Sequence, residues 1–131
     1  MTYAQQSTRY REMEVLSASP GQLVVILYDH LLASLRRARL AIEGNNIEQR
    51  VTYLDKSRAA VTELLVTLDQ AKGGAVAANL SSLYAWILSE LLDIGARPDV
   101  HRLDKVIGIA AELRDAFSQI AEAATKSQPA A

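Results

Sequence analysis

Apolar residues recur at spacings of three and four along most of this chain, and that periodicity predicts helices. The first predicted helix opens within "SASPGQLVVILYDHLL", residues 17–32. Its start signal consists of Ser19, Pro20 and Gln22: the hydroxyl accepts from the backbone three residues on, proline presets the first turn, and glutamine reaches back. The pattern continues to Glu43, and Gly44 ends it.

A second helix is predicted after Asn46, which with Gln49 forms a similar start signal. It should end near Lys72, because Gly73 and Gly74 can adopt left-handed dihedrals that stop a helix. Its apolar stripe is interrupted only at Arg58 and consists of Ile47, Val51, Leu54, Val61, Leu65 and Leu68.

Two further helices complete the pattern. The third is expected to start at Gly74 or, as the less favoured choice, at Asn79, and to end before Gly95; Asp99 then caps the fourth. The fourth helix carries its apolar stripe on Leu103, Val106, Ala110, Leu113, Phe117, Ile120 and Ala124. The fold class is therefore all-α: an antiparallel four-helix bundle over residues 17–125, after an N-terminal arm or short capping helix (1–16) and before a disordered tail (126–131).

The third helix is more apolar than core burial requires. At 100° per residue its apolar positions cover about half the circumference, against a stripe of about 100° for an ordinary core-facing helix, and Trp86 lies beyond that arc. Residues 23–28 nearly encircle the first helix in the same way. Two interpretations stay open: the excess contacts neighbouring helices and the arm, or it forms a surface for a partner.

Composition narrows the classes of partner. The 131 residues carry 14 Lys and Arg against 15 Asp and Glu, a net charge of −1, so no basic field favours nucleic acid or an anionic membrane. The chain has no cysteine, which excludes disulfides and thiolate metal sites. The polar N-terminus does not resemble a signal peptide, and no apolar run approaches the ~20 residues of a membrane span, so we expect a cytoplasmic protein without membrane insertion.

Catalytic and metal-binding patterns are also missing from the sequence. Neither His30 nor His101 belongs to a Glu-x-x-His motif of the kind that holds metals in helical bundles, so we expect no enzyme, metal or cofactor. His30 lies on a predicted helix but lacks the His-x-x-Lys-Gly pattern of phosphotransfer bundles. A phosphotransfer bundle acting through His30 and a helical adaptor for an unrelated partner remain the alternative functions.

Three ordered motifs resemble one known family. They are "YREMEVLSASPGQLVVILYDHLL", "TLDQAKGGAVAANLSSLYAWI" and "ELRDAF", and the resemblance extends from about Tyr10 to Ala121. In content, order and spacing they are similar to the flagellar secretion chaperones called FliS. The resemblance implies a cytoplasmic, helical chaperone that binds the C-terminal segment of flagellin, prevents its premature polymerisation and aids its delivery to the flagellar type III export apparatus.

The resemblance also implies partners and site residues. The partners are flagellin and, as a second candidate, an export-gate component; the chain itself is expected to be a monomer or weak homodimer. Tyr10 matches the family's N-terminal tyrosine, with Tyr3 as runner-up, and we hypothesise that the arm covers the binding surface until the client arrives. The other client-binding candidates are Leu27, Tyr28, Asp29, Leu68, Asp69, Asn79, Leu80, Leu83 and Tyr84.

The chain departs from the family pattern mainly in its third helix. After Tyr84 it has Ala85 and Trp86 where the family has Asp and an aromatic residue, and it has Ser89 and Glu90 where Arg pairs are usual. In the last helix, Phe117 stands where the family usually has a tryptophan. These changes remove positive charge and one carboxylate from the third helix, so we do not expect any ionic contact that the family makes there, and they leave the apolar groove in place.

Overall fold

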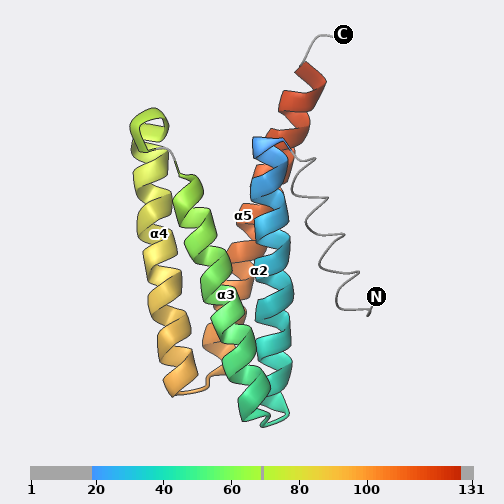
Figure 1. Cartoon of the computed structure of the whole chain (residues 1–131), viewed down its shortest axis with the longest axis vertical. Helices are drawn as coiled ribbons and strands as arrows, with labels where there is room; N and C mark the ends of the chain where they lie inside the picture. The colour runs from blue at the N-terminus through green and yellow to red at the C-terminus, as the bar shows by residue number, and fades with distance from the viewer. Residues whose placement is uncertain (1–18, 69, 128–131) are drawn as a thin grey trace, which may run out of the picture.

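The computed structural model describes residues 19–68 and 70–127, which form four helices. They are α2 (Pro20–Glu43), α3 (Ile47–Thr67), α4 (Gln70–Ala96) and α5 (Val100–Ser127). Consecutive helices run in opposite directions, so the predicted all-α, antiparallel four-helix bundle is confirmed (Figure 1). The predicted arm and residues 128–131 of the predicted tail lie outside the described residues.

Three of the helices begin directly after a residue whose side chain caps the helix N-terminus. Ser19 and Gln22 form the predicted capping box: the Ser19 N–H donates to Gln22 Oε1 over 3.0 Å, and the Gln22 N–H donates to Ser19 Oγ over 3.2 Å. The side chain of Asn46 accepts from the Gln49 N–H over 3.0 Å, and that of Asp99 accepts from the Arg102 N–H over 3.1 Å. These caps confirm the starts expected for the first, second and fourth helices.

The connection between α3 and α4 differs from the prediction. Helix α3 ends at Thr67 instead of near Lys72, because Leu68 is already extended, with φ −72° and ψ 123°. One helical turn then precedes a kink at Gly74, where φ is +54° and ψ is −128°. Gly74 does take the positive φ that favours glycine, but it interrupts α4 and does not terminate α3.

The core contains side chains from all four helices. Its fully buried members include Tyr28, Leu35, Leu64, Leu91 and Val106. On α3 the core position next to Arg58 is filled by Ser57, whose hydroxyl donates to the Tyr53 carbonyl oxygen over 2.8 Å. The core position between Leu54 and Val61 is therefore Ser57, a small residue with its own hydrogen bond, and Arg58 is a half-buried neighbour outside the core.

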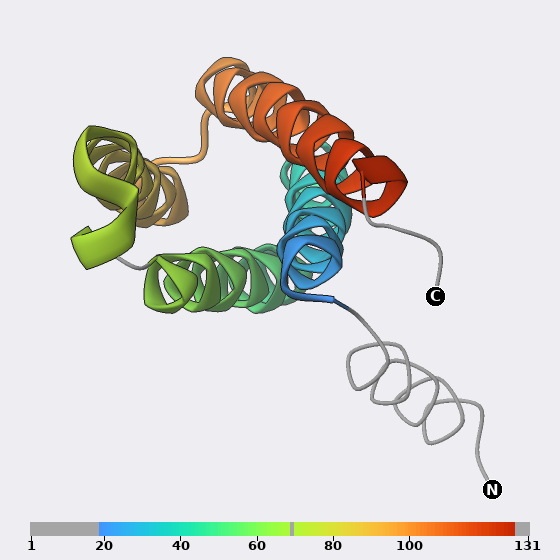
Figure 2. The same cartoon turned by 90° about the horizontal axis from the view of Figure 1, so that it is seen from above.

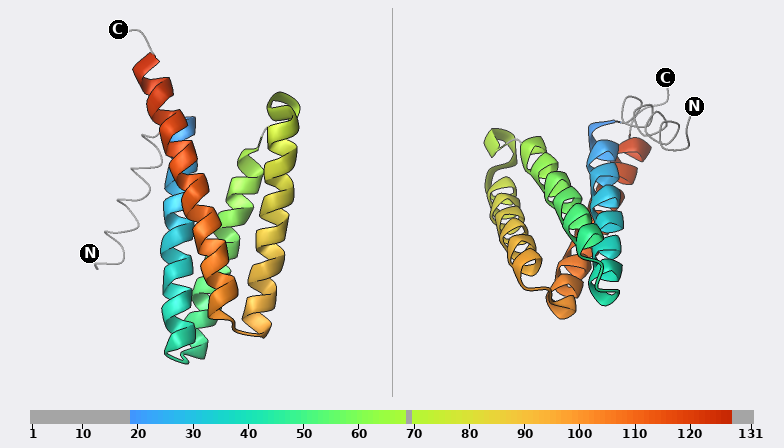
Figure 3. Two further views of the ribbon diagram at one scale, coloured as in Figure 1. Left: turned by 180° about the vertical axis from the view of Figure 1, so that it is seen from behind. Right: turned by 60° about the horizontal axis from the view of Figure 1, so that its bottom comes forward.

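The bundle is closed at one end and open at the other. Helix α4 packs mainly against α3, and α5 packs mainly against α2. Helices α4 and α5 meet at the loop that joins them and diverge toward the other end (Figures 2 and 3). We call the end that holds this loop the closed end and the end where α2 begins the open end.

Candidate functional site

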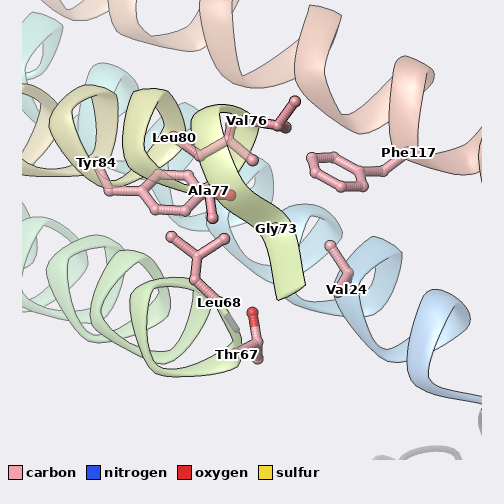
Figure 4. Close-up of a pocket in the computed structure, with 9 residues that line it drawn as sticks. All are labelled: Val24, Thr67, Leu68, Gly73, Val76, Ala77, Leu80, Tyr84 and Phe117. Atoms are coloured by element: carbon pink, nitrogen blue, oxygen red, sulfur yellow. The ribbon is translucent and has the colours of Figure 1, made fainter. Parts of the chain in front are cut away.

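A pocket of about 330 Å³ lies at the open end, between α4 and the other three helices (Figure 4). Helix α4 supplies most of its wall, α3 and the residue after it supply one side, and α2 and α5 supply one residue each. The lining is mainly apolar and consists of Val24, Thr67, Leu68, Gly73, Val76, Ala77, Leu80, Tyr84 and Phe117. Such a surface suits apolar side chains of another molecule.

Three aromatic side chains, Tyr28, Tyr84 and Phe117, pack together beside the pocket. The hydroxyls of Tyr28 on α2 and Tyr84 on α4 are hydrogen-bonded at 2.6 Å, and both side chains are buried. The ring of Phe117 on α5 stacks on Tyr28, with centroids 5.5 Å apart. Figure 4 shows the Tyr84 ring extending from α4 toward the cavity that Phe117 closes on the far side.

Burial keeps this tyrosine pair neutral. It raises the pKa of Tyr28 far above its ordinary value, and the hydrogen bond to Tyr84 raises it further. The pKa of Tyr84 is also raised, chiefly by burial. Both hydroxyls therefore stay protonated at physiological pH, and the base of the pocket carries no charge.

Two glycines shape the mouth of the pocket. A Cβ placed on Gly73 would lie 2.5 Å from the Cβ of Ala77, which is closer than real Cβ atoms approach. Gly74 has open space around it, but its φ of +54° disfavours any other residue. The turn that carries these glycines thus brings the backbone of α4 close to the pocket without side chains that would fill it.

Much of the surplus apolar surface of α4 is found in this half of the bundle, although Leu92 beyond it is 58% exposed. Val76 is 67% exposed, while Leu80, Leu83 and Trp86 are half-buried and pack against the edge of the core. The Nζ of Lys105 lies 5.9 Å from the Trp86 ring centroid, so one cation borders the apolar strip. The wide arc seen in the sequence therefore serves the core on one side and an open surface on the other.

The structure brings only part of the expected site together. Leu68, Leu80 and Tyr84 line the pocket, and Tyr28 lies directly behind it. Leu27 and Leu83 are half-buried against the core, and Asn79 is exposed. Tyr10 and Asp69 lie outside the described residues. Sequence reasoning missed Val24, Thr67, Gly73, Val76, Ala77 and Phe117 as pocket residues, although Val76 and Leu80 share the spacing of four that places residues on one helix face.

Asp29 has a partner within the chain. One of its carboxylate oxygens accepts from Arg114 Nε over 2.9 Å, which joins α2 to α5. Both side chains are partly exposed, at 50% and 34%. This contact assigns Asp29 a structural connection that the sequence motif alone does not reveal.

Glu90, one of the departures from the family pattern, forms an ion pair within the chain. Glu90 on α4 accepts two hydrogen bonds from Arg102 on α5, of 3.0 and 2.7 Å, at the closed end. Asp93 accepts a third from the same guanidinium over 3.3 Å. The negative charge that Glu90 brings to α4 is thus compensated inside the bundle.

Comparison with known proteins identifies the family of the chain. The family model described as flagellar protein FliS matches residues 2–124. The chain belongs to the FliS family. It is 36% identical over 124 residues to the flagellar secretion chaperone FliS of Salmonella typhimurium, covering 94% of this chain and 90% of that protein.

Two further FliS relatives come from other bacteria. The flagellar secretion chaperone FliS of Campylobacter jejuni is 33% identical over 119 residues, covering 91% of this chain and 93% of that protein. That of Bacillus subtilis is 28% identical over 121 residues, covering 92% and 90%. The resemblance drawn from the three sequence motifs is therefore confirmed across nearly the whole chain.

One expectation about membranes needs correction. The stretch Gly73–Ala96 of α4 is long and apolar enough to cross a bilayer by length and composition, although we expected no such run in this FliS chain. A single helix of this kind is weak evidence for a span, because a core helix of a soluble protein passes the same test. Here the stretch includes the core residues Tyr84, Ile87, Leu91 and Ile94, and 22% of its apolar window is buried in the bundle.

Proposed function

We propose that this FliS-family chain is a cytoplasmic export chaperone that binds the C-terminal segment of flagellin. In this role it keeps the segment from polymerising early and aids its delivery to the flagellar type III export apparatus. The observation that carries the proposal is the apolar pocket at the open end, together with the exposed apolar strip of α4 beside it. An amphipathic segment that is disordered when free needs such a surface to fold against.

The proposed binding mode places an apolar side chain of the client in the pocket. Leu68 and Leu80 would contact it directly, and Phe117 would form the opposite wall. Leu27 and Leu83, half-buried at the edge of the core, would extend the apolar surface where the client continues. Ordering the client typically costs about 2–5 kcal/mol of the interaction energy, so a broad contact area is required.

Some of the motif residues receive other roles or stay predictions. The exposed amide of Asn79 is a candidate hydrogen-bond partner for the client backbone. Asp29 would act mainly through its ion pair with Arg114. Tyr10, Asp69 and the autoinhibitory arm remain predictions; deleting residues 1–15 should speed client association or increase self-association.

The proposal is tested by isothermal titration with the last ~50 residues of flagellin from the same organism, which would extend about 75 Å as one helix. We expect one-to-one binding between about nanomolar and micromolar affinity, with a negative heat-capacity change from apolar burial. Leu80→Ala should weaken binding. Leu40→Ala is the matched control, because Leu40 is 67% exposed on α2 and does not line the pocket.

A folded sample that does not bind this segment would refute the flagellin proposal. An adaptor for another helical client would then be the better interpretation. Incubation with a phosphodonor, with His30→Ala as the control, would test the phosphotransfer alternative in the same samples.

A further inference from the structure

The hydrogen bond between Tyr28 and Tyr84 joins two helices that are not neighbours in the bundle. Helix α3 lies between α2 and α4 in the circuit of helices, as the view from above shows (Figure 2). The two hydroxyls nevertheless meet at 2.6 Å, with exposed fractions of 0% for Tyr28 and 1% for Tyr84. Two long aromatic side chains, joined end to end, thus span the core between α2 and α4.

We propose that this hydroxyl pair is a brace that sets the distance between α2 and the open half of α4. In this arrangement both tyrosines hold the pocket walls in position, and neither hydroxyl contacts the client. Tyr84 itself lines the pocket, and Tyr28 supports Phe117, which forms the opposite wall. Any shift of the pair therefore displaces both walls. The part of this inference that concerns binding rests on the proposed function.

The energetics of burial explain why the pair acts as a brace. A buried hydroxyl without a partner is penalised, so separating the two oxygens by even a small distance is unfavourable. Other contacts restrain α4 elsewhere: the ion pairs of Arg102 with Glu90 and Asp93 lie at the closed end. Toward the open end α4 and α5 diverge (Figure 3), so the tyrosine pair acts where α4 has the least support from α5.

The first test measures the distance without any client. Because the chain has no cysteine, a pair of spin labels can be attached at Ala33→Cys and Ala78→Cys. The distance between these labels reports the separation of α2 from the open half of α4. Ala33→Cys with Ser89→Cys reports on the half of α4 beyond Tyr84, and all three positions are exposed. In the full-length protein, Tyr28→Phe and Tyr84→Phe should each broaden the first distance distribution and leave the second unchanged.

Tyr53→Phe is the matched control for the loss of a tyrosine hydroxyl. Tyr53 accepts a hydrogen bond from Arg37 over 3.0 Å outside the core, so its removal should change neither distribution. If the first distribution is the same in Tyr28→Phe, Tyr84→Phe and the parent protein, the brace is refuted. Should a single variant fail to fold, the double variant replaces it, because no hydroxyl is then left unpaired.

The second test separates positioning from contact. Each single variant should weaken flagellin binding by at most about twelvefold, because the hydrogen bond can favour the binding-competent pocket by no more than its own free energy. The double variant should be no weaker than the singles, because both remove the same interaction. Losses that multiply in the double variant would overturn the inference, since each hydroxyl would then contribute independently. If the parent protein does not bind flagellin, the proposed function fails, while the distance measurement still decides about the brace.

Discussion

The two ends of the bundle use the apolar surface of α4 in different ways. At the closed end Ile87, Leu91 and Ile94 are fully buried in the core. At the open end Val76 is 67% exposed and Leu80 is half-buried in the pocket wall. Ile120, on the facing helix α5, is 63% exposed. Although Leu92 is 58% exposed near the closed end, α4 buries more of its apolar residues beyond Tyr84, and the part between the kink at Gly74 and Tyr84 carries the proposed binding surface.

The cause of this difference is the divergence of α4 from α5. Where the helices approach, their side chains interlock and Arg102 bridges to Glu90. Where they separate, side chains of the same kind are only partly covered: Leu80 is half-buried and Val76 is exposed. A surplus of apolar residues in a sequence is thus best understood through the angle between helices, because that angle decides which residues are covered.

The largest expected effect contrasts a leucine from each half. Leu91→Ala should destabilise the protein by about 2–5 kcal/mol, because Leu91 is fully buried and its removal leaves a cavity. Leu80→Ala should destabilise it less and weaken flagellin binding more. Urea unfolding beside calorimetric titration measures both quantities. Equal losses of stability would show that Leu80 belongs to the core and would remove the contrast between the two ends.

A smaller effect is expected at the turn that opens the pocket. Gly74→Ala should destabilise by about 1–3 kcal/mol, because an L-residue is strained at a φ of +54° and a ψ of −128°. Gly108→Ala is the control: Gly108 lies within α5 with no atom near the added Cβ, so alanine should stabilise by roughly 0.5–1 kcal/mol. Thermal unfolding of the two variants should therefore shift in opposite directions, and a shift in the same direction would contradict the kink at Gly74.

A third, smaller effect on stability is expected from the ion pair of Asp29 and Arg114, which joins α2 to α5. Asp29→Asn should cost at most about 1 kcal/mol of stability, because both groups are partly exposed. Exchanging the charges with Asp29→Arg and Arg114→Asp should recover part of that loss. If Asp29→Asn weakens flagellin binding strongly at unchanged stability, and the exchange does not restore binding, Asp29 contacts the client directly.

The smallest expected effect is a pH dependence outside the pocket. The hydrogen bond from Arg39 lowers the pKa of Asp104 below its ordinary 3.8, so the folded state favours the charged carboxylate. The stability that the Asp104 carboxylate contributes is complete at a pH above that ordinary pKa. It disappears as the pH falls through the lower pKa of the folded state. The stability difference between the parent protein and Asp104→Asn should therefore shrink as the pH falls below about pH 4. A difference that does not change with pH would contradict the pairing of Asp104 with Arg39.

Most of the fold was predictable because its signals are local. The caps at Ser19, Asn46 and Asp99 connect residues three positions apart, so the helix starts follow from short stretches of sequence. The junction at Leu68 was not predicted, since glycine marks where a helix can stop and tertiary packing decides whether it does. Helix α3 stops five residues before Lys72, the expected end, and Gly74 kinks the next helix instead.

The sequence by itself determined the four helices, the family and the excess of apolar residues on α4. Only the tertiary structure decided which of those residues line the pocket, that Phe117 and Val24 complete it, and that Asp29 is paired with Arg114. The reason is physical: periodicity reports the face of a helix, whereas a pocket depends on the distance between helices that are far apart in the sequence. In this protein that distance differs between the two ends of the bundle, so the apolar residues of α4 have different surroundings at the two ends.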